Sequence, residues 1–230
     1  MKDSPFQRIL KTLKIETNIG RAPESSLREL AQDARLHDFE KGEYVFRAGD
    51  ESEYVHLLER GRIVLSKTSH SGKSFTFMIA IKGTTLNAVT CFMGRHRFFS
   101  ARVAERTTVV TIPSKIFKQW VLSHPEVAAG ILTTMGDLLD GAYTRILDLI
   151  DESAENRILN ALNMLCARIG PKLSLGNRDV AEMTGVSRET AARVISNLQK
   201  LNLVEKSRGS ILILDPSQLK DLSTSPFFIL

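Results

Sequence analysis

The sequence predicts an α+β protein with an N-terminal antiparallel barrel or roll, a long helix and a C-terminal winged helix-turn-helix domain. Three observations support this prediction. Short β-type runs separated by glycines fill residues 36–112, apolar residues recur at helical spacing from Glu126 onward, and a helix-turn-helix pattern begins near Asn177. The chain has 230 residues, which exceeds the usual single-domain size, so more than one domain is expected.

The composition is that of a folded protein rather than a disordered or membrane-spanning one. The chain is 43% hydrophobic and 25% charged, with a net charge of +5 that is compatible with a polyanionic partner. No apolar run approaches the ~20 residues of a transmembrane helix, and the N-terminus lacks the apolar stretch of a secretory signal, so we expect a cytoplasmic protein without membrane association. Two cysteines, Cys91 and Cys166, are too few for a disulfide framework.

Strand-like runs and regularly spaced glycines dominate residues 36–112. The runs are rich in β-branched and aromatic residues, as in FTFMIAI and TTVVTI. Six glycines follow one another at intervals of 7, 12, 11, 11 and 11 residues: Gly42, Gly49, Gly61, Gly72, Gly83 and Gly94. Strands of ordinary length joined by tight turns give this spacing, so a small antiparallel barrel or roll is predicted.

A helix of about 25 residues is predicted over 126–150, which is longer than the mean globular helix of ~11–12 residues. Its apolar residues lie mostly three or four apart: Val127, Ile131, Met135, Leu138, Leu139, Ala142, Ile146 and Ile150. Either the roll covers this stripe or a second copy of the helix covers it in a homodimer. Residues 151–153 interrupt the pattern, and a second helical pattern then runs to Gly170-Pro171.

Residues 172–230 predict the order strand, helix, turn, helix, hairpin and helix. A first helix over 177–183, a turn at 184–186 and an N-cap at Ser187 define a helix-turn-helix whose second helix runs to about Leu201. Small residues stand where two crossed helices need them, at Ala181 and Ala191, and a positive φ is expected at Gly185.

The exposed side of the second helix predicts DNA binding. Arg188, Glu189 and Arg193 lie in its first two turns, where an arginine fork matches guanine and a carboxylate can accept a hydrogen bond from cytosine. The alternative is an ordinary exposed Glu–Arg pair. The following hairpin forms a wing that brings Lys206 and Arg208 near phosphates, and residues 188–208 hold five basic and two acidic residues.

The run VSRETAARVISNLQKLNLVE, together with KGEYVFRAGDESEYVHLLERGRIVL nearer the N-terminus, resembles the CRP/FNR family of bacterial transcription regulators from about Leu36 to Leu222. The resemblance implies a double-stranded, jelly-roll-like β-roll of cyclic-nucleotide-binding type as the sensor domain (1–122), a dimerisation helix and hinge (123–151) and a winged helix-turn-helix domain (152–230). It further implies a homodimer through residues 126–150, contact with RNA polymerase and a palindromic site. The Ser-Arg-Glu-Thr-x-x-Arg version of the motif implies TGTGA-like half-sites read by Ser187, Arg188, Glu189, Thr190 and Arg193.

The sensor part departs from the cyclic-AMP-binding relatives. Asn87-Ala88-Val89 stands where they carry Gly-Glu-Leu, and Arg97-Phe98 stands where they carry Arg-Ser. Ala142 and Tyr143 replace the hydroxyl-bearing residues that contact the base. These residues form the expected effector pocket, but cyclic AMP is not the expected effector, and an iron–sulfur cluster is disfavoured because it needs about four thiolates.

The effector itself stays unknown. Haem is left open by His56 and His96, and Cys91 is interpreted as a small core residue, with a redox or ligand role for Cys91 or His96 as the alternative. The aromatic residues Phe75, Phe77, Phe98 and Phe99 fit either a hydrophobic ligand pocket or the barrel core, and the core is favoured.

Two other functions were weighed against DNA binding. A nucleotide- or haem-responsive module could use its winged domain to bind protein instead. An enzyme is not expected, because no nucleophile–base pair or metal-spaced cluster occurs and the five histidines are scattered.

Overall fold

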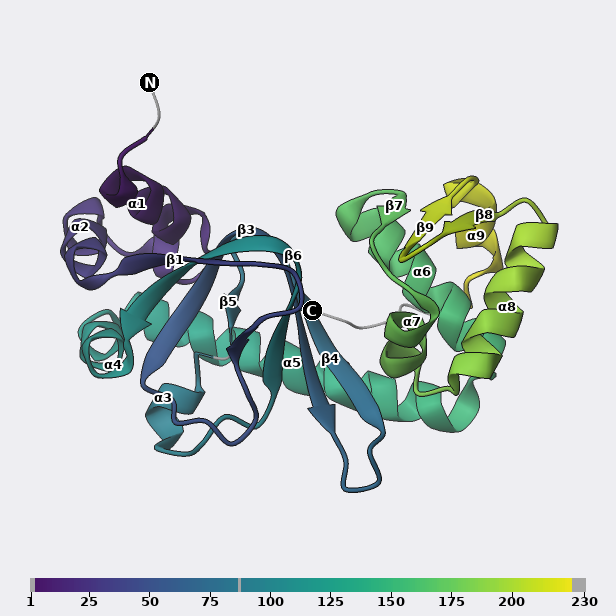
Figure 1. The fold of residues 1–230 in the computed structure, drawn as a ribbon. Helices are drawn as coiled ribbons and strands as arrows, with labels where there is room; N and C mark the ends of the chain where they lie inside the picture. Colours follow the sequence, from purple (N-terminus) through teal and green to yellow (C-terminus); the bar gives the residue numbers. More distant parts are fainter. Residues whose placement is uncertain (1–2, 87, 225–230) are drawn as a thin grey trace. The chain divides into compact units, whose positions relative to one another are not determined.

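The structure is a computed structural model that describes residues 3–86 and 88–224. Asn87, one of the expected effector-pocket residues, and the C-terminal residues 225–230 lie outside the described residues. The chain packs as two compact units, each described here by itself (Figure 1). The first comprises Met1–Lys67 and Met78–Asp137, and the second comprises Thr68–Phe77 and Leu138–Leu230. The predicted boundaries at 122/123 and 151/152 stay predictions.

The N-terminal part contains the predicted β-roll. Its strands are β1 (Arg35–Phe39), β2 (Tyr44–Phe46), β3 (Tyr54–Thr68), β4 (Ser74–Ala80), β5 (Thr85–Leu86) and β6 (Ser100–Pro113). They form one sheet in the order β1-β6-β3-β4, with β2 paired to β6 and β5 paired to β3. The described registers are antiparallel, and β6 runs alongside both β1 and β3, for example with Leu36 opposite Val110 and Val110 opposite Leu57.

All six spaced glycines have positive φ values. The prediction of a tight turn at each of them is wrong for Gly61, which lies inside the single strand β3, and for Gly94, which caps α3. Gly61 has the strictest requirement, because it combines a φ of +96° with close packing against β6. A Cβ at this position would lie 2.3 Å from Oγ1 of Thr107 and 2.7 Å from the carbonyl oxygen of Arg106. Only glycine fits there without displacing the neighbouring strand.

Helices that the sequence analysis did not predict cover one part of the roll. They are α1 (Pro5–Ile15), the 3₁₀ turn η1 (Ile19–Arg21) and α2 (Glu24–Asp33). Ser4 caps α1 in a capping box with Gln7, and Pro5 begins the helix, which is a start signal readable from the sequence. Leu13 and Leu30 join Leu57 and Ile112 in one core with Phe117 of α4 (Ser114–Leu122).

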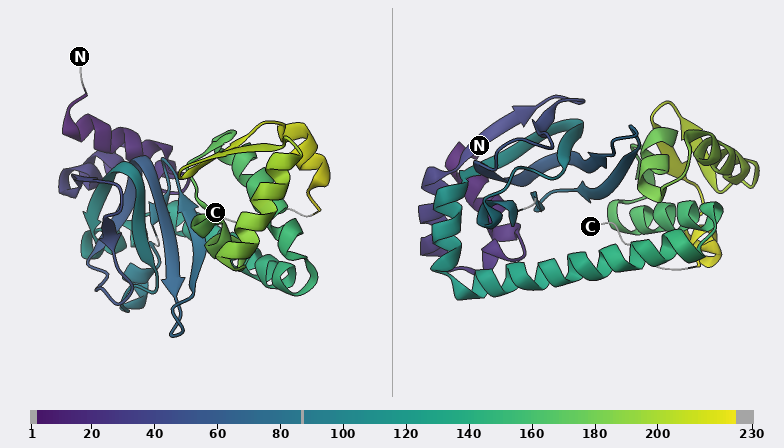
Figure 2. Two further views of the ribbon diagram at one scale, coloured as in Figure 1. Left: turned by 45° about the vertical axis from the view of Figure 1, so that its right-hand side comes forward. Right: turned by 90° about the horizontal axis from the view of Figure 1, so that it is seen from below.

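The long helix is confirmed as α5 (Pro125–Asp151), which Figure 2 shows as one unbroken helix. Within the first unit its N-terminal half is held by the N-terminal segment. The Asn18 amide donates to the Thr134 hydroxyl at 2.9 Å, and Gly130 leaves room for that amide, because a Cβ at Gly130 would lie 2.5 Å from Oδ1 of Asn18.

The C-terminal part confirms the predicted order of elements. It contains α6 (Ala154–Ile169), β7 (Lys172–Leu173), α7 (Asn177–Thr184), α8 (Arg188–Lys200), β8 (Val204–Ser207), β9 (Ser210–Ile213) and α9 (Pro216–Leu222). The strands form a small sheet in the order β7-β9-β8. Its core joins Leu162 of α6 to Val180 of α7, Ile195 of α8 and Ile211 of β9, all fully buried.

In the N-terminal roll, a short helix, α3 (Thr90–Met93), precedes β6.

Candidate nucleic-acid interface and effector region

The helix-turn-helix is built as its spacing predicts. Ser187 has extended backbone angles, and its hydroxyl oxygen accepts a hydrogen bond from the Thr190 amide at 3.1 Å, so it is the N-cap of α8. Gly185 ends α7 in the left-handed conformation, with a φ of +67°. Ala181 and Ala191 are buried between the two helices, together with Val194 and Leu198 on the inner face of α8.

The opposite face of α8 is free for a partner. Arg188, Glu189 and Arg193 are exposed in its first two turns, whereas Thr190 is half-buried. Arg188 and Arg193 have no ion-pair partner among the described residues, and the i,i+4 pair considered as the alternative for Glu189 and Arg193 does not form in the structure. Both guanidinium groups are thus available for an external acceptor.

The carboxyl group of Glu189 is held in its charged form. A hydrogen bond with its own backbone amide lowers the pKa of Glu189, and the Ser187 hydroxyl and the charge of Arg188 act in the same direction. A charged carboxylate accepts hydrogen bonds and donates none, so it matches an amino group such as that of cytosine.

The predicted wing is the β8–β9 hairpin. Ser207 pairs with Ser210 across a turn in which Gly209 has a φ of +75°. Lys206 and Arg208 are exposed at this end of the hairpin, and neither has an ion-pair partner among the described residues. The wing therefore presents two positive charges beside those of α8 in the sequence-predicted interface.

Two arginines hold the turn between α7 and α8, and the sequence analysis did not single out either of them. Arg145 of α5 donates to the carbonyl oxygen of Met183. Arg157 of α6 donates to the carbonyl oxygen of Thr184 at 2.9 Å and to that of Glu152 at 2.7 Å. The carbonyls of Met183 and Thr184 lie at the C-terminal end of α7, where helix carbonyls lack intrahelical partners. In the sequence, Arg145 stands out as a charged residue among the apolar positions of the long helix, and this was the signal that could have identified it.

The expected effector-pocket residues that the structure describes are divided between the two units, with Ala88, Arg97 and Phe98 in the first and Ala142 and Tyr143 in the second. Arg97 is only 3% exposed, and its guanidinium donates to the Thr90 hydroxyl at 3.2 Å and to the carbonyl of Tyr54. It also lies over the Phe46 ring, 4.3 Å from the centroid. Burial lowers the pKa of Arg97, whose two terminal nitrogens donate to protein acceptors while its buried Nε has no hydrogen-bond partner among the described residues. Ala88 is half-buried next to α3.

Phe98 and Tyr143, two further residues of the expected pocket, are both exposed. Phe98 is 58% exposed, contacts Phe99 edge-on and lies under the ammonium group of Lys67, so the core interpretation is wrong for this residue. Tyr143 is 56% exposed on α5.

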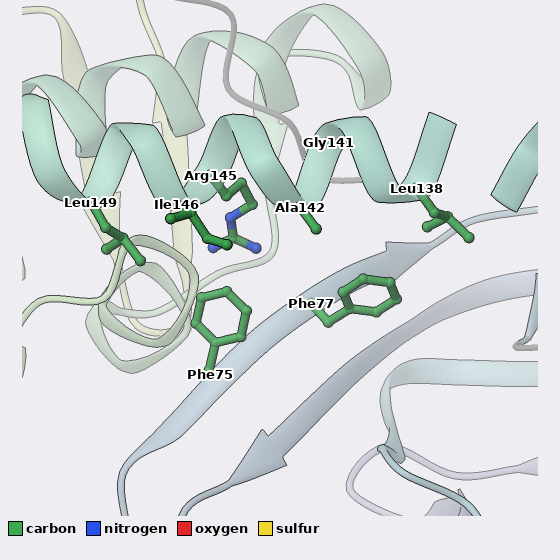
Figure 3. Close-up of a pocket in the computed structure, with 8 residues that line it drawn as sticks. All are labelled: Phe75, Phe77, Leu138, Gly141, Ala142, Arg145, Ile146 and Leu149. Carbon is green, nitrogen blue, oxygen red and sulfur yellow. The ribbon is translucent and has the colours of Figure 1, made fainter. Parts of the chain in front are cut away.

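Ala142 instead lines an apolar cavity of about 230 Å³ in the second unit (Figure 3). Half-buried Phe75 and Phe77 of β4 face it from the side opposite α5, so these two aromatic residues line a pocket and the core interpretation is wrong for them as well.

The residues weighed for redox or haem chemistry differ in their surroundings. Burial raises the pKa of Cys91 to about 11, and its thiol donates to the Ala88 carbonyl at 2.9 Å. Burial lowers the pKa of His56 to about 3, with the positive charge of Arg97 adding to the effect. His96 is exposed.

Across residues 3–86 and 88–224 no three His, Cys, Asp or Glu side chains are grouped as a metal site would need. Over the same ranges no helix is both long enough and apolar enough to cross a membrane.

Comparisons with known proteins cover both parts of the chain. Residues 36–124 match the model of the cyclic nucleotide-binding domain, and residues 156–222 match that of the Crp-like helix-turn-helix domain. The global nitrogen regulator of Synechococcus elongatus is 24% identical over 195 residues, which cover 80% of this chain and 88% of that protein. The CRP-like cAMP-activated global transcriptional regulator of Mycobacterium tuberculosis is 20% identical over 203 residues, or 85% of this chain and 91% of that protein.

Solved structures show the same fold. A regulator of the Crp/Fnr family from Eubacterium rectale superposes with a TM-score of 0.74 at 20% identity, covering 92% of this chain and all of that one. The c-di-GMP responsive global regulator CLP of Xanthomonas campestris gives a TM-score of 0.74 at 16% identity, covering 84% of this chain and all of that one. With both family domains in order around a long helix, the chain belongs to the CRP/FNR family of DNA-binding transcription regulators.

Proposed function

We propose that the protein acts as a homodimer that binds a palindrome with TGTGA-like half-sites and changes its DNA affinity when an effector binds. The observation that carries this proposal is the first half of α8, where Arg188, Glu189 and Arg193 are exposed above a buried inner face. Side chains at this end of a recognition helix reach base edges in the major groove. The proposal assigns sensing to residues 1–122, dimerisation to 123–151 and DNA reading to 152–230, in a cytoplasmic protein that also contacts RNA polymerase.

Base readout by Glu189 gives the direct test. Replacing Glu189→Ala should weaken discrimination at one base pair of the half-site by roughly 1–3 kcal/mol, or about 5- to 150-fold, because an acceptor for the cytosine amino group is lost. Fluorescence anisotropy on the palindrome and on single-base variants measures the effect. Glu205→Ala, which removes an exposed carboxylate from β8, is the matched control. Unchanged selectivity in Glu189→Ala would exclude the assigned role.

Salt dependence separates this function from the second candidate, a winged domain that binds protein. We assign phosphate contacts to three exposed cations per copy: Lys200, Lys206 and Arg208. Six such contacts in a dimer predict that the logarithm of the affinity falls with the logarithm of salt concentration with a slope of about −5. A slope near zero would favour the protein-binding function.

The homodimer is supported by the uncovered apolar stripe of α5. Its members are large hydrophobic side chains spaced three or four residues apart: Leu132, Met135, Leu139, Tyr143, Ile146 and Ile150, which are 39–72% exposed. This spacing matches a helix that pairs with its own copy. Leu139→Glu should give monomers in sedimentation velocity, whereas Thr133→Glu, on the polar face of the same helix, should leave dimers. Dimeric Leu139→Glu would refute the pairing.

We propose an effector other than cyclic AMP. Arg97, at the position that meets the phosphate in cyclic-AMP-binding relatives, is buried and donates from its two terminal nitrogens to the Thr90 hydroxyl and the Tyr54 carbonyl. Ala142 brings no hydroxyl and faces apolar side chains. Calorimetric titration with cyclic AMP should therefore show no saturable binding, and saturable binding would overturn this part of the proposal. Haem is the remaining alternative, and a Soret band in the purified protein would identify it.

A further inference from the structure

Arg145 is a buried cation that joins three segments distant in sequence. It lies on α5 and is 7% exposed. One guanidinium nitrogen donates to the carbonyl oxygen of Thr76 in β4 at 2.8 Å, and the other donates to the carbonyl oxygen of Met183 in α7. The guanidinium also stacks over the Phe75 ring, 4.3 Å from its centroid, as Figure 3 shows. All these residues belong to the second unit.

The group remains charged despite its burial. Desolvation lowers the pKa of Arg145 to about 10, while the nearby charge of Asp148 acts in the opposite direction. A buried charge is costly unless its hydrogen bonds are well placed, and a planar guanidinium can hold two acceptors in a fixed geometry. The Thr76 and Met183 carbonyls are thus linked through one planar guanidinium group.

The Met183 carbonyl lies immediately before the turn that positions the recognition helix. Gly185 follows it, and an added Cβ there would lie 2.9 Å from Cδ2 of Leu149, one helical turn beyond Arg145 on α5. Met183 is fully buried, so its carbonyl cannot turn to water instead. A displacement of Arg145 must therefore move the end of α7 or break its hydrogen bond.

Thr76 connects the same guanidinium to the roll through the chain itself. Strand β4 begins in the second unit and continues into residues 78–80, which are buried in the first unit. Strand β4 also pairs with β3 in the roll sheet. A change in the tilt or register of β4 would therefore reach the Thr76 carbonyl directly.

We propose that Arg145 is the positioning residue that couples the β3–β4 hairpin to the helix-turn-helix. The inference rests on the proposed effector control, since it names how a change in the roll reaches α8. Arg157 also caps α7 but has no bond to the hairpin among those found in the described residues, so it supports the turn without carrying this coupling.

A double-mutant cycle read by hydrogen–deuterium exchange tests the coupling without DNA. Gly72→Val strains the backbone of the hairpin turn, because Gly72 has a φ of +79°. The substitution introduces no clash at its Cβ, since no atom lies within 4 Å of that position. In an otherwise unchanged chain this substitution should speed amide exchange in residues 181–190 by about threefold or more. In Arg145→Lys, which keeps the charge but loses the planar fork, Gly72→Val should add nothing further.

Arg157→Lys is the matched control. It should speed exchange at the turn by itself, yet the additional effect of Gly72→Val should persist in it. If the hairpin effect persists equally in Arg145→Lys, or if Gly72→Val changes nothing in the parent chain, Arg145 does not couple the two segments. Arg145→Met provides a second variant in which the hydrogen bonds are removed entirely.

Operator affinity of the same set of variants tests the proposed function separately. If Gly72→Val and Arg145→Lys have independent effects on amide exchange, while the parent chain binds the operator, only the proposed coupling is overturned. Failure of the parent chain to bind DNA, with the exchange cycle as expected, would overturn only the proposed operator function.

Discussion

Substituting Gly185→Ala tests whether the bend of the helix-turn-helix requires glycine. Gly185 has a φ of +67°, and a residue with a Cβ in this conformation costs roughly 1–2 kcal/mol. Alanine also restricts the unfolded chain, which returns about 0.4–1 kcal/mol. The backbone effect alone should therefore lower the free energy of unfolding by about 1 kcal/mol.

The contact with α5 adds a second cost. The new Cβ would lie 2.9 Å from Cδ2 of Leu149, which must move. Leu149 is 46% exposed and this atom is the end of a flexible side chain, so the adjustment should cost a further few tenths of a kcal/mol. The total expected loss is between about 1 and 1.5 kcal/mol.

Two glycines on the same chain separate the effects. Gly209 has a φ of +75° but open space around an added Cβ, so Gly209→Ala should show the backbone cost alone. Gly136 lies exposed within α5 and has neither restriction, so Gly136→Ala should raise stability by about 0.5–1 kcal/mol. Urea unfolding followed by far-ultraviolet circular dichroism measures all three. Gly185→Ala with stability equal to or above the parent chain would refute the reasoning.

Three further predictions concern single side chains. Ser187→Ala should lower the free energy of unfolding by about 1 kcal/mol, because α8 loses its N-cap. Ser187→Thr keeps a hydroxyl and should retain most of the stability that the cap provides. Equal melting curves for Ser187→Ala and the parent chain would show that the cap does not stabilise the fold. The pKa of His56 is about 3 in the folded chain and near its ordinary value in the unfolded chain, so acidification favours unfolding. Between pH 6.5 and pH 5 the free energy of unfolding should fall by about 1.5 kcal/mol from this residue. This pH-dependent fall should disappear in His56→Leu. Cys91, with a pKa of about 11, should be about a thousandth thiolate at pH 8 and react slowly with iodoacetamide, whereas rapid alkylation would restore a redox role.

Local patterns were sufficient for most of the fold. The spaced glycines do adopt positive φ, although Gly61 lies within β3 rather than at a turn, and the apolar repeat predicted a helix within one residue of the observed α5. Ser187 and Gly185 predicted the cap and bend of the helix-turn-helix. The N-terminal helices went unpredicted although Ser4, Pro5 and Gln7 form a readable start signal. Such features depend on backbone angles and neighbours a few residues away, which sequence spacing records directly.

The effector region shows what sequence spacing could not provide. Arg97 was expected to face an effector, but it is 3% exposed and donates to the carbonyl oxygen of Tyr54, 43 residues away. Arg145 gained its place through partners 69 and 38 residues away, at Thr76 and Met183. The sequence by itself determined most of the elements, the recognition helix and its exposed charges. Only the tertiary structure decided which acceptors the buried cations reach and which segments they join, because those hydrogen bonds depend on the packing of distant backbone carbonyls.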